Sequence, residues 1–393
     1  RTHTAVKIAP HYGGLTVHVP DASRAVGVVA RAVSPTERPA LAAETRELYA
    51  KVREQHENAL GSRELLSLAQ ARSRGPRFDD WSHVARPRSP GVTTFVPYPL
   101  EELVPVVDWG PFFSAWELPG RYPAVLDDLR KGEAARSLFA DAQAMLARVV
   151  AEGWLEARAV LGLFPAASDG DDILVYAGEE RREVARVIRT LRQQTAKREG
   201  QPNLALADYV APAGSGVEDW VGAFAVSVHG AEERAARFRA DADDYSAILL
   251  TTLADRLAEA LAERLHQRVR TELWGYAPDE DLTTEDLVAE RYRGIRPAPG
   301  YPACPDHRTK RDVFALLGAT AATGIRLTEG LAMTPASAVA GLYLAHPGAR
   351  YFGVGRVGRD QVEDLAARSG TSVAEVEEWL APNLAYAPAV AAD

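Results

Sequence analysis

The feature that most constrains the fold of this chain is a proline-rich segment at residues 294–307, which reads Gly-Ile-Arg-Pro-Ala-Pro-Gly-Tyr-Pro-Ala-Cys-Pro-Asp-His. Each of its four prolines fixes the backbone angle φ and removes a hydrogen-bond donor. The segment can therefore form neither a helix nor a central strand. We predict a stiff, extended loop whose carbonyl oxygens remain able to accept hydrogen bonds.

Three residues suggest what such a loop could bind. Arg296 carries a planar guanidinium suited to a carboxylate or a phosphate, Tyr301 offers a ring face, and Gly300 permits close approach of a ligand to the backbone. These residues favour a preformed binding loop for a small molecule with a carboxylate and a flat ring. A rigid structural connector is the alternative that the residues leave open.

Composition limits the class of protein. The chain has 393 residues, enough for two or three domains, but only one cysteine (Cys304) and two methionines. This excludes a disulfide framework and a cysteine-based zinc site, and it predicts a cytoplasmic protein. No apolar run approaches membrane-spanning length, so we expect no membrane partner. Because the chain begins at Arg1 without a methionine, we expect a fragment of a larger protein.

Charge is distributed unevenly along the chain. Residues 1–90 hold 14 Lys and Arg against 9 Asp and Glu, whereas residues 91–393 hold 31 against 45. This change predicts a boundary near residue 90. The acidic character of the larger part argues against nucleic acid as a partner.

Hydrophobic periodicity gives the expected elements. Helices are predicted at residues 24–33, 44–57, 133–152 and 246–270 and from Ser372, and strands at 15–20, 159–164, 172–176, 223–228, 324–328 and 350–354. Because helices and strands do not alternate strictly, we predict an α+β fold with a twisted antiparallel sheet and flanking helices. The expected domains are a truncated α/β (Rossmann-like) remnant at 1–57, a basic linker at 58–90 that docks through residues 78–81, and a large mixed domain at 91–393.

Two patterns that could indicate other chemistry are rejected. The segment Gly353–Gly358 matches G-x-G-x-x-G, but it lies too near the end of the chain for a dinucleotide-binding fold, and we read it as a glycine-containing strand. The nine histidines show no metal-ligand spacing, and Cys304 has no evident histidine partner. We therefore predict no metal site and no catalytic residue.

Acidic residues could complement the binding loop. Asp108 precedes Trp109, and Glu259 lies with Asp255 and Glu263 along one face of the predicted helix at 246–270. Carboxylates and aromatic faces stabilise a sulfonium or an ammonium. Solvated surface charges are the alternative, unless these residues converge on the proline-rich loop.

At this loop the sequence resembles the reactivation domain of cobalamin-dependent methionine synthase. The resemblance covers residues 75–393 almost continuously, and residues 1–57 are similar to the end of the preceding cobalamin-binding domain. The motifs that carry it, besides the segment from Arg293 to His307, are Val107-Asp-Trp-Gly-Pro-Phe-Phe113, Leu191-Arg-Gln-Gln-Thr195, Asp208-Tyr-Val-Ala-Pro212, Trp274-Gly-Tyr-Ala-Pro278, Gly358-Arg-Asp-Gln-Val-Glu-Asp364 and Trp379-Leu-Ala-Pro-Asn383. The cobalt-coordinating D-x-H-x-x-G motif and the homocysteine and folate modules of the family are absent from this sequence.

The resemblance implies a site for S-adenosylmethionine. Arg296 would hold the methionine carboxylate and Asp108 its amino group. Glu259 and Glu290 would lie near the sulfonium. The adenosine and the rest of the pocket would involve Ala298, Gly300, Tyr301, Tyr351 and Phe352.

The resemblance also implies a methyltransferase role within methionine biosynthesis. The domain would position the methyl of S-adenosylmethionine for reductive methylation of oxidised cobalamin to methylcobalamin, which supports methyl transfer from 5-methyltetrahydrofolate to homocysteine. Its implied partners are the cobalamin-binding domain of the same enzyme, which holds most of the cobalamin, and a flavodoxin-type reductase. The alternative is a docking and regulatory module that caps the cobalamin domain and recruits the reductase without productive S-adenosylmethionine binding.

Overall fold

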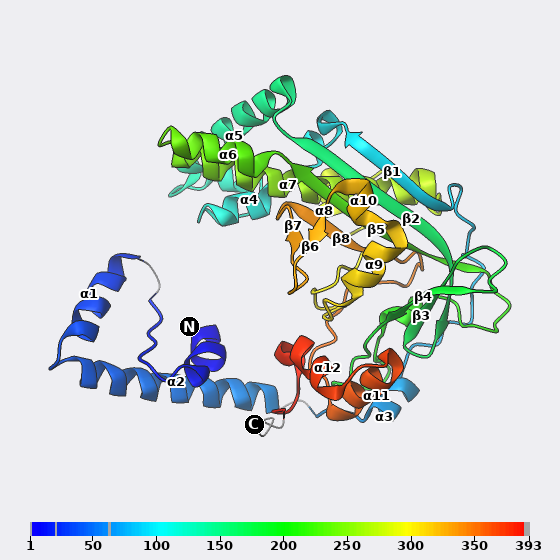
Figure 1. Ribbon diagram of the computed structural model, residues 1–393, viewed down its shortest axis with the longest axis horizontal. Helices are drawn as coiled ribbons and strands as arrows, with labels where there is room; N and C mark the ends of the chain where they lie inside the picture. The colour runs from blue at the N-terminus through cyan, green and yellow to red at the C-terminus, as the bar shows by residue number, and fades with distance from the viewer. Residues whose placement is uncertain (1, 20–21, 62–63, 389–393) are drawn as a thin grey trace. The chain divides into compact units, whose positions relative to one another are not determined.

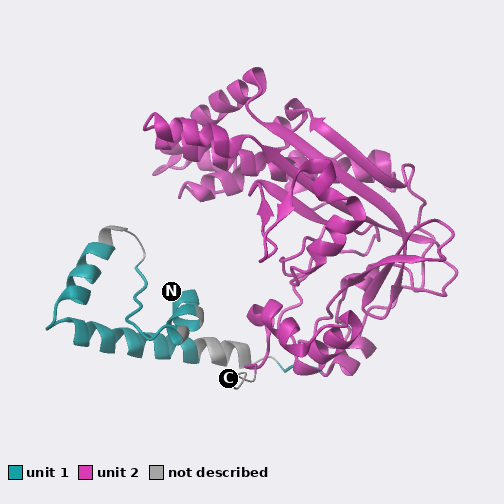
Figure 2. Cartoon of the chain, in the orientation of Figure 1, with its two compact units in different colours: residues 1–66 teal, residues 67–393 magenta. Residues whose placement is uncertain are grey.

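The computed structural model describes residues 2–19, 22–61 and 64–388. The chain divides into two compact units, residues 1–66 and 67–393, coloured separately in Figure 2. The division lies earlier in the chain than the predicted boundary near residue 90, because residues 67–90 belong to the larger unit.

The main elements of the smaller unit are helices. It contains α1 (Ala22–Val33) and α2 (Arg38–Gly61), preceded by a short π-helical turn at Thr4–Ile8. The two predicted helices are present. The strand predicted at 15–20 is wrong over residues 15–19, and Pro20 lies outside the described residues. The segment is extended but has no neighbouring strand to pair with, and the His18 amide donates to the Tyr49 hydroxyl instead (2.8 Å).

The larger unit is built on one antiparallel sheet (Figure 1). Its main path runs β4-β3-β2-β5-β8, and β1 also pairs with β2. The bounds are β1 (Gly91–Tyr98), β2 (Glu156–Asp169), β3 (Asp172–Tyr176), β4 (Val184–Arg189), β5 (Asp219–His229) and β8 (Ala338–Tyr343). A separate two-stranded ribbon joins β6 (Arg326–Leu327) to β7 (Met333–Thr334).

Helices cover both faces of this sheet. Along β2, Leu161 and Leu163 contact the core on one face, whereas Val160, which precedes Leu161, contacts the core on the other. This alternation buries both faces, as the period of two in a strand requires. The first core is closed by α4 (Trp109–Ala115), α5 (Gly132–Glu152), α6 (Ala231–Ala240) and α7 (Asp244–Arg268), and the second by α9 (Thr309–Leu317) and α10 (Ala319–Thr323).

A third, smaller core lies toward the C-terminus. It is formed by α11 (Arg359–Ser369) and α12 (Val373–Trp379) with Leu191, Val354 and Val357. The remaining short α-helices of the larger unit are α3 (Leu68–Ser73) and α8 (Thr284–Val288). The α+β prediction with an antiparallel sheet and flanking helices is confirmed, and the helix predicted from Ser372 begins there, with the Ser372 side chain accepting from the Glu375 amide (3.1 Å).

Two strand predictions near the end of the chain need correction. Residues 350–354 form no strand; the Val354 amide donates to the Pro302 carbonyl (2.8 Å), and the Gly353 carbonyl accepts from the Gln193 side chain (2.7 Å). The G-x-G-x-x-G segment is likewise irregular rather than a strand. Of the strand predicted at 324–328, only Arg326–Leu327 pairs.

The predicted linker also has more structure than expected. Helix α2 extends to Gly61 and α3 follows at Leu68–Ser73. Hydrogen bonds connect residues 85–89 with the rest of the larger unit; for example, the Trp274 indole donates to the Ala85 carbonyl (2.9 Å), and the Ser89 amide donates to the Leu273 carbonyl (2.8 Å). The predicted docking segment packs Phe78 against Tyr209 and His346.

Candidate functional site

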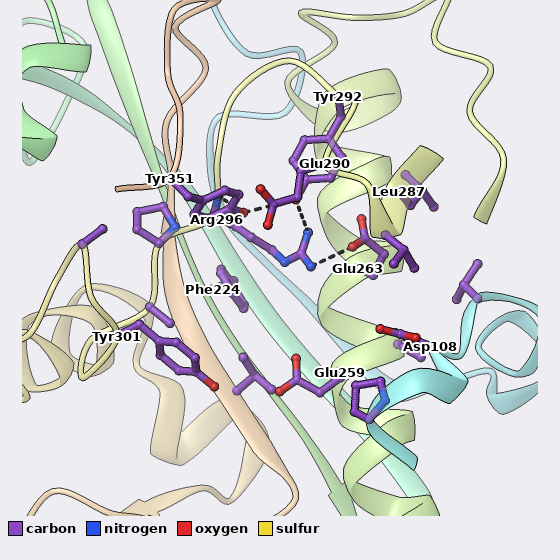
Figure 3. Close-up of a pocket in the computed structure, with 18 of the residues that line it drawn as sticks. Asp108, Phe224, Glu259, Glu263, Leu287, Glu290, Tyr292, Arg296, Tyr301 and Tyr351 are labelled. Carbon is purple, nitrogen blue, oxygen red and sulfur yellow. Dashed lines mark hydrogen bonds and ion pairs between the residues drawn. The ribbon is translucent and has the colours of Figure 1, made fainter. Parts of the chain in front are cut away.

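A cavity of about 700 Å³ opens beside α7, between that helix, the proline-rich loop and the start of α4 (Figure 3). Its size is that of a site for a small molecule. Its polar lining residues are Asp108, Arg256, Glu259, Glu263, Thr284, Glu290, Tyr292, Arg296, Tyr301 and Tyr351, and apolar contacts come from Phe224, Leu287, Val339 and Phe352, among others.

The proline-rich loop forms one wall of the cavity because it is bonded along β8. The Ile295 amide donates to the Leu344 carbonyl (2.9 Å), and the Leu344 amide donates to the Ile295 carbonyl (3.0 Å). The Leu342 amide donates to the Pro297 carbonyl (2.9 Å). Some carbonyl oxygens of the proline-rich loop thus accept hydrogen bonds from the chain at β8. These bonds hold the loop in an extended path.

Gly300 has a different structural role from the one expected. It does not line the cavity. Its φ is +93°, and a Cβ at this position would lie 2.2 Å from the His307 ring, so any other residue would clash. Its missing side chain makes room for His307, and contact of Gly300 with a ligand stays a prediction.

Arg296 is held at the base of the cavity by several side chains. Its Nη2 forms an ion pair with Glu263 Oε2 (2.7 Å), and its Nη1 donates to the Tyr292 hydroxyl (3.1 Å). Nη1 also lies 3.3 Å from His266 Nδ1. Because a guanidinium can only donate, His266 Nδ1 must act as the acceptor, and its proton therefore resides on Nε2.

Burial determines the charge states in this cluster. His266 is fully buried, and burial together with the nearby Arg270 and Arg296 holds its pKa well below the ordinary value, so the ring is neutral. Burial of Arg296 lowers its pKa, but the ion pair with Glu263 outweighs this effect and the net shift is upward. The hydroxyl of Tyr292 lies 3.2 Å from that of Tyr351, and burial raises the pKa of Tyr292, which remains protonated.

Acidic groups also line the cavity: Glu290 lies beside Arg296 and Tyr292, whereas Asp108 and Glu259 lie away from them (Figure 3). Asp108 caps α4, with Oδ1 accepting from the Gly110 amide (2.9 Å). Within the residues that the structure covers, Oδ2 of Asp108 and the carboxylates of Glu259 and Glu290 make no hydrogen bond or ion pair with the protein. Glu290 follows α8 with φ at +56°, an uncommon conformation for a residue other than glycine. These carboxylates are therefore available to a cationic ligand.

Two comparisons with known proteins identify the family. The model of the vitamin B12 dependent methionine synthase activation domain matches residues 99–370. A solved structure described as the MetH reactivation domain bound to AdoHcy is similar over 82% of this chain and 99% of that chain, with 48% sequence identity and a TM-score of 0.80. The chain belongs to the B12-dependent methionine synthase activation-domain family.

The family membership predicted from the sequence is thus confirmed, and it places the chain in the context of a methyltransferase. The structure brings together eight of the nine residues predicted for the ligand site of this activation domain. Those lining the cavity are Asp108, Glu259, Glu290, Arg296, Ala298, Tyr301, Tyr351 and Phe352. Their contact with a ligand is not shown by this arrangement.

Four residues of this site are not predicted from the sequence. Glu263 is predicted only as part of an acidic helix face, His266 only as one of the scattered histidines, and Tyr292 and Arg270 not at all; of the four, Glu263 and Tyr292 line the cavity. A usable signal existed, because Glu259, Glu263, His266 and Arg270 recur at helical spacing along one stripe of α7 and the following turn. Polar residues recurring inside a leucine-rich helix indicate a buried polar site.

Other candidate chemistry finds no support among residues 2–19, 22–61 and 64–388. Cys304 is buried, and burial raises the pKa of its thiol to about 12, which disfavours the reactive thiolate. Those residues contain no cluster of His, Cys, Asp and Glu that could hold a metal ion. None of the helices formed by them is long and apolar enough to cross a membrane.

Proposed function

We propose that this chain binds S-adenosylmethionine in the cavity beside α7 and positions its methyl group for reactivation of the cobalamin of methionine synthase. The observation that carries this proposal is that groups of both charges line one cavity. The guanidinium of Arg296 lines it together with the carboxylates of Glu259 and Glu290, which have no protein partner among the described residues, and with Asp108, whose Oδ2 is likewise unpaired. The similar MetH reactivation domain is described as bound to AdoHcy, the demethylated form of this ligand.

The cavity has complementary groups for each end of the proposed ligand. Arg296 would receive the carboxylate, and Asp108 Oδ2 would receive the ammonium. Glu259 and Glu290 would face the sulfonium. The adenosine would lie along the loop at Ala298, Gly300 and Tyr301, with Tyr351 and Phe352 completing the site; Tyr301 is 59% exposed and can therefore stack on a flat ring.

The protein groups have a positioning role in this scheme. The positive charge on sulfur disappears as the methyl leaves, so a carboxylate that stabilised the sulfonium strongly would favour the substrate over the transition state. We therefore assign Glu259 and Glu290 to binding and not to acceleration of the chemical step. Alignment of the methyl group is the main contribution that the cavity can make.

Cobalamin supplies the nucleophile that accepts the methyl group once it has been reduced. The cavity volume of about 700 Å³ suits a nucleoside-sized molecule and not a corrin. The corrin is therefore assigned mainly to the cobalamin-binding domain of the same enzyme. The same proposal includes three further points. A flavodoxin-type reductase supplies the electron, the protein is cytoplasmic, and the complete enzyme transfers methyl from 5-methyltetrahydrofolate to homocysteine.

Calorimetric titration of the chain with S-adenosylmethionine and with AdoHcy tests the proposal. We expect saturable binding of both ligands with one site per chain. Absence of binding at millimolar ligand would favour the second candidate function, a module that caps the cobalamin domain and recruits the reductase without using the ligand. The unpartnered carboxylates at the cavity favour the first candidate.

A further inference from the structure

Glu263 lies between two arginines and contacts them unequally. Its Oε2 is 2.7 Å from Arg296 Nη2, whereas its Oε1 is 4.0 Å from Arg270 Nη1. Arg270 is completely buried, and Glu263 is 13% exposed. Neither Glu263 Oε1 nor Arg270 Nη1 has a hydrogen-bond partner in the described part of the chain.

An unsatisfied acceptor facing an unsatisfied donor is costly in a buried site, because each has lost its hydrogen bonds to water. A movement of Glu263 by about 1 Å would bring the two atoms within hydrogen-bond distance. Arg270 cannot make the approach as easily, since its other nitrogens hold Glu280 through three contacts of 2.7–2.9 Å. The mobile member of this pair is therefore Glu263.

The charges of the cluster explain why the position of Glu263 matters. Two arginines, Arg270 and Arg296, face two carboxylates, Glu263 and Glu280, and His266 is neutral. The cluster is balanced without a ligand. A ligand carboxylate that reaches Arg296 therefore meets a guanidinium already paired with Glu263, and it must compete with that side chain.

We propose that Glu263 is a positioning residue that transfers from Arg296 to Arg270 when a ligand carboxylate binds Arg296. This inference rests on the proposed function, because it requires a ligand with a carboxylate. Glu263 thereby selects ligands that carry a carboxylate. Arg270 receives the Glu263 carboxylate after its displacement, and Glu263 Oε1 and Arg270 Nη1 become hydrogen-bond partners in the bound state.

Glu263→Gln tests the competition. AdoHcy is compared with decarboxylated AdoHcy, which keeps the adenosine, the sulfur and the amine, by calorimetry on the full chain. Removing the competing charge leaves the arginines in excess, so we expect AdoHcy to bind about fivefold more tightly and the decarboxylated ligand to bind unchanged. Glu272→Gln is the matched control. Glu272 is half exposed and pairs with Arg268, four residues earlier in the chain, so its replacement should leave both affinities unchanged.

A purely supporting role of Glu263 predicts the reverse, since loss of the ion pair would let Arg296 move and would weaken AdoHcy binding. That result would overturn the proposal. Failure of wild-type protein to bind AdoHcy would instead refute the proposed function itself. AdoHcy binding that is unaffected by Glu263→Gln would refute only the role of Glu263.

Arg270→Lys provides a second, independent measurement. Lysine keeps the charge but cannot hold Glu280 and receive Glu263 together. We expect about tenfold weaker AdoHcy binding in the wild-type background and little change in the Glu263→Gln background. An equal loss in both backgrounds would contradict the transfer. If this variant does not fold, a structure of the wild-type chain with AdoHcy decides, because Glu263 must then lie within hydrogen-bond distance of Arg270 Nη1.

Discussion

The larger unit buries two arginine-centred clusters that differ in how completely their atoms are satisfied. Arg192 uses every side-chain nitrogen: Nε bonds Asp171 (2.7 Å), Nη1 bonds the Asn203 carbonyl (2.8 Å) and Asp208, and Nη2 bonds Asp208 (2.7 Å). Around Arg296, in contrast, Glu263 Oε1, Arg270 Nη1 and His266 Nε2 have no partner among the described residues.

This difference separates a structural cluster from a binding cluster. Arg192 connects residues distant in the sequence, and no ligand could improve its hydrogen bonding. The cluster at Arg296 borders a cavity and retains unused hydrogen-bonding capacity. Buried polar groups are ordinarily satisfied in native proteins, so unsatisfied atoms beside a cavity indicate a site prepared for another state.

The largest effect is expected at Arg192, whose side-chain nitrogens are all hydrogen-bonded. Arg192→Met leaves Asp208 buried without its counter-charge and Asp171 with Arg72 as its remaining partner, which costs about 3–5 kcal/mol of unfolding free energy. Urea denaturation followed by circular dichroism measures this change. The folded fraction should bind AdoHcy with wild-type affinity. A loss of stability below about 1 kcal/mol would remove the distinction between the two clusters.

The next effect is expected at the cavity. Arg296→Ala should weaken AdoHcy binding by about 1.5–3 kcal/mol, the value of a hydrogen bond to a charged group. Calorimetry measures this loss, with decarboxylated AdoHcy as the control ligand, whose affinity should change far less. Wild-type affinity for AdoHcy in this variant would mean that the ligand carboxylate binds elsewhere.

The stability of the cluster at Arg296 should also depend on pH through His266. The pKa of His266 is lowered on folding by burial and by Arg270 and Arg296, so the unfolded state binds a proton that the folded state excludes. Stability is therefore fully present above the unfolded pKa, about 6.5, and decreases as pH falls below it, by up to about 1.4 kcal/mol per pH unit. Urea denaturation between pH 7.5 and 5 should show a smaller slope for His266→Asn. An unchanged slope would contradict burial of a neutral ring.

The smallest effect is expected on the surface. Arg86 and Glu179 form an ion pair at 2.7 Å, but both side chains are about half exposed. Such pairs contribute little because water and salt screen them. Glu179→Gln should leave the unfolding midpoint and the ligand affinity within experimental error. A clear destabilisation would show that the distance between the charges, and not their burial, determines how much an ion pair contributes to stability.

The fold could be predicted where hydrophobic periodicity is strong. Helix α7 and strands β2 and β5 follow their patterns, whereas β8 was missed because Ala338-Val-Ala-Gly-Leu-Tyr343 is rich in small residues. The structure explains this composition: a Cβ at Gly341 would lie 2.6 Å from the Pro297 carbonyl and 2.9 Å from the Phe224 ring. The small residues admit the proline-rich loop, a requirement of tertiary structure that a local pattern does not reveal.

The candidate site likewise has residues that the sequence predicts and residues that only the structure reveals. Arg296 and Tyr301 were identified from the chemistry of one short segment, and the resemblance to the family supplied Tyr351, Phe352 and Glu290. The convergence of Asp108 and Glu259 on that segment depends on the packing of α4 and α7, which the sequence alone does not specify. Tyr292 and His266 act through contacts with Arg296, and such contacts become visible only in three dimensions.

The attachment of the proline-rich loop to β8 has a kinetic consequence. Prolines reduce the number of conformations that the unfolded chain must give up, and the bonds at Ile295 and Pro297 hold the loop in place without a ligand. Amide hydrogen exchange at Leu342 and Leu344 should therefore be equally slow before and after ligand addition. Ligand binding to the cavity then requires no ordering of this wall, and the association rate is governed by diffusion, by the release of water from the cavity and by the movement of Glu263 away from Arg296.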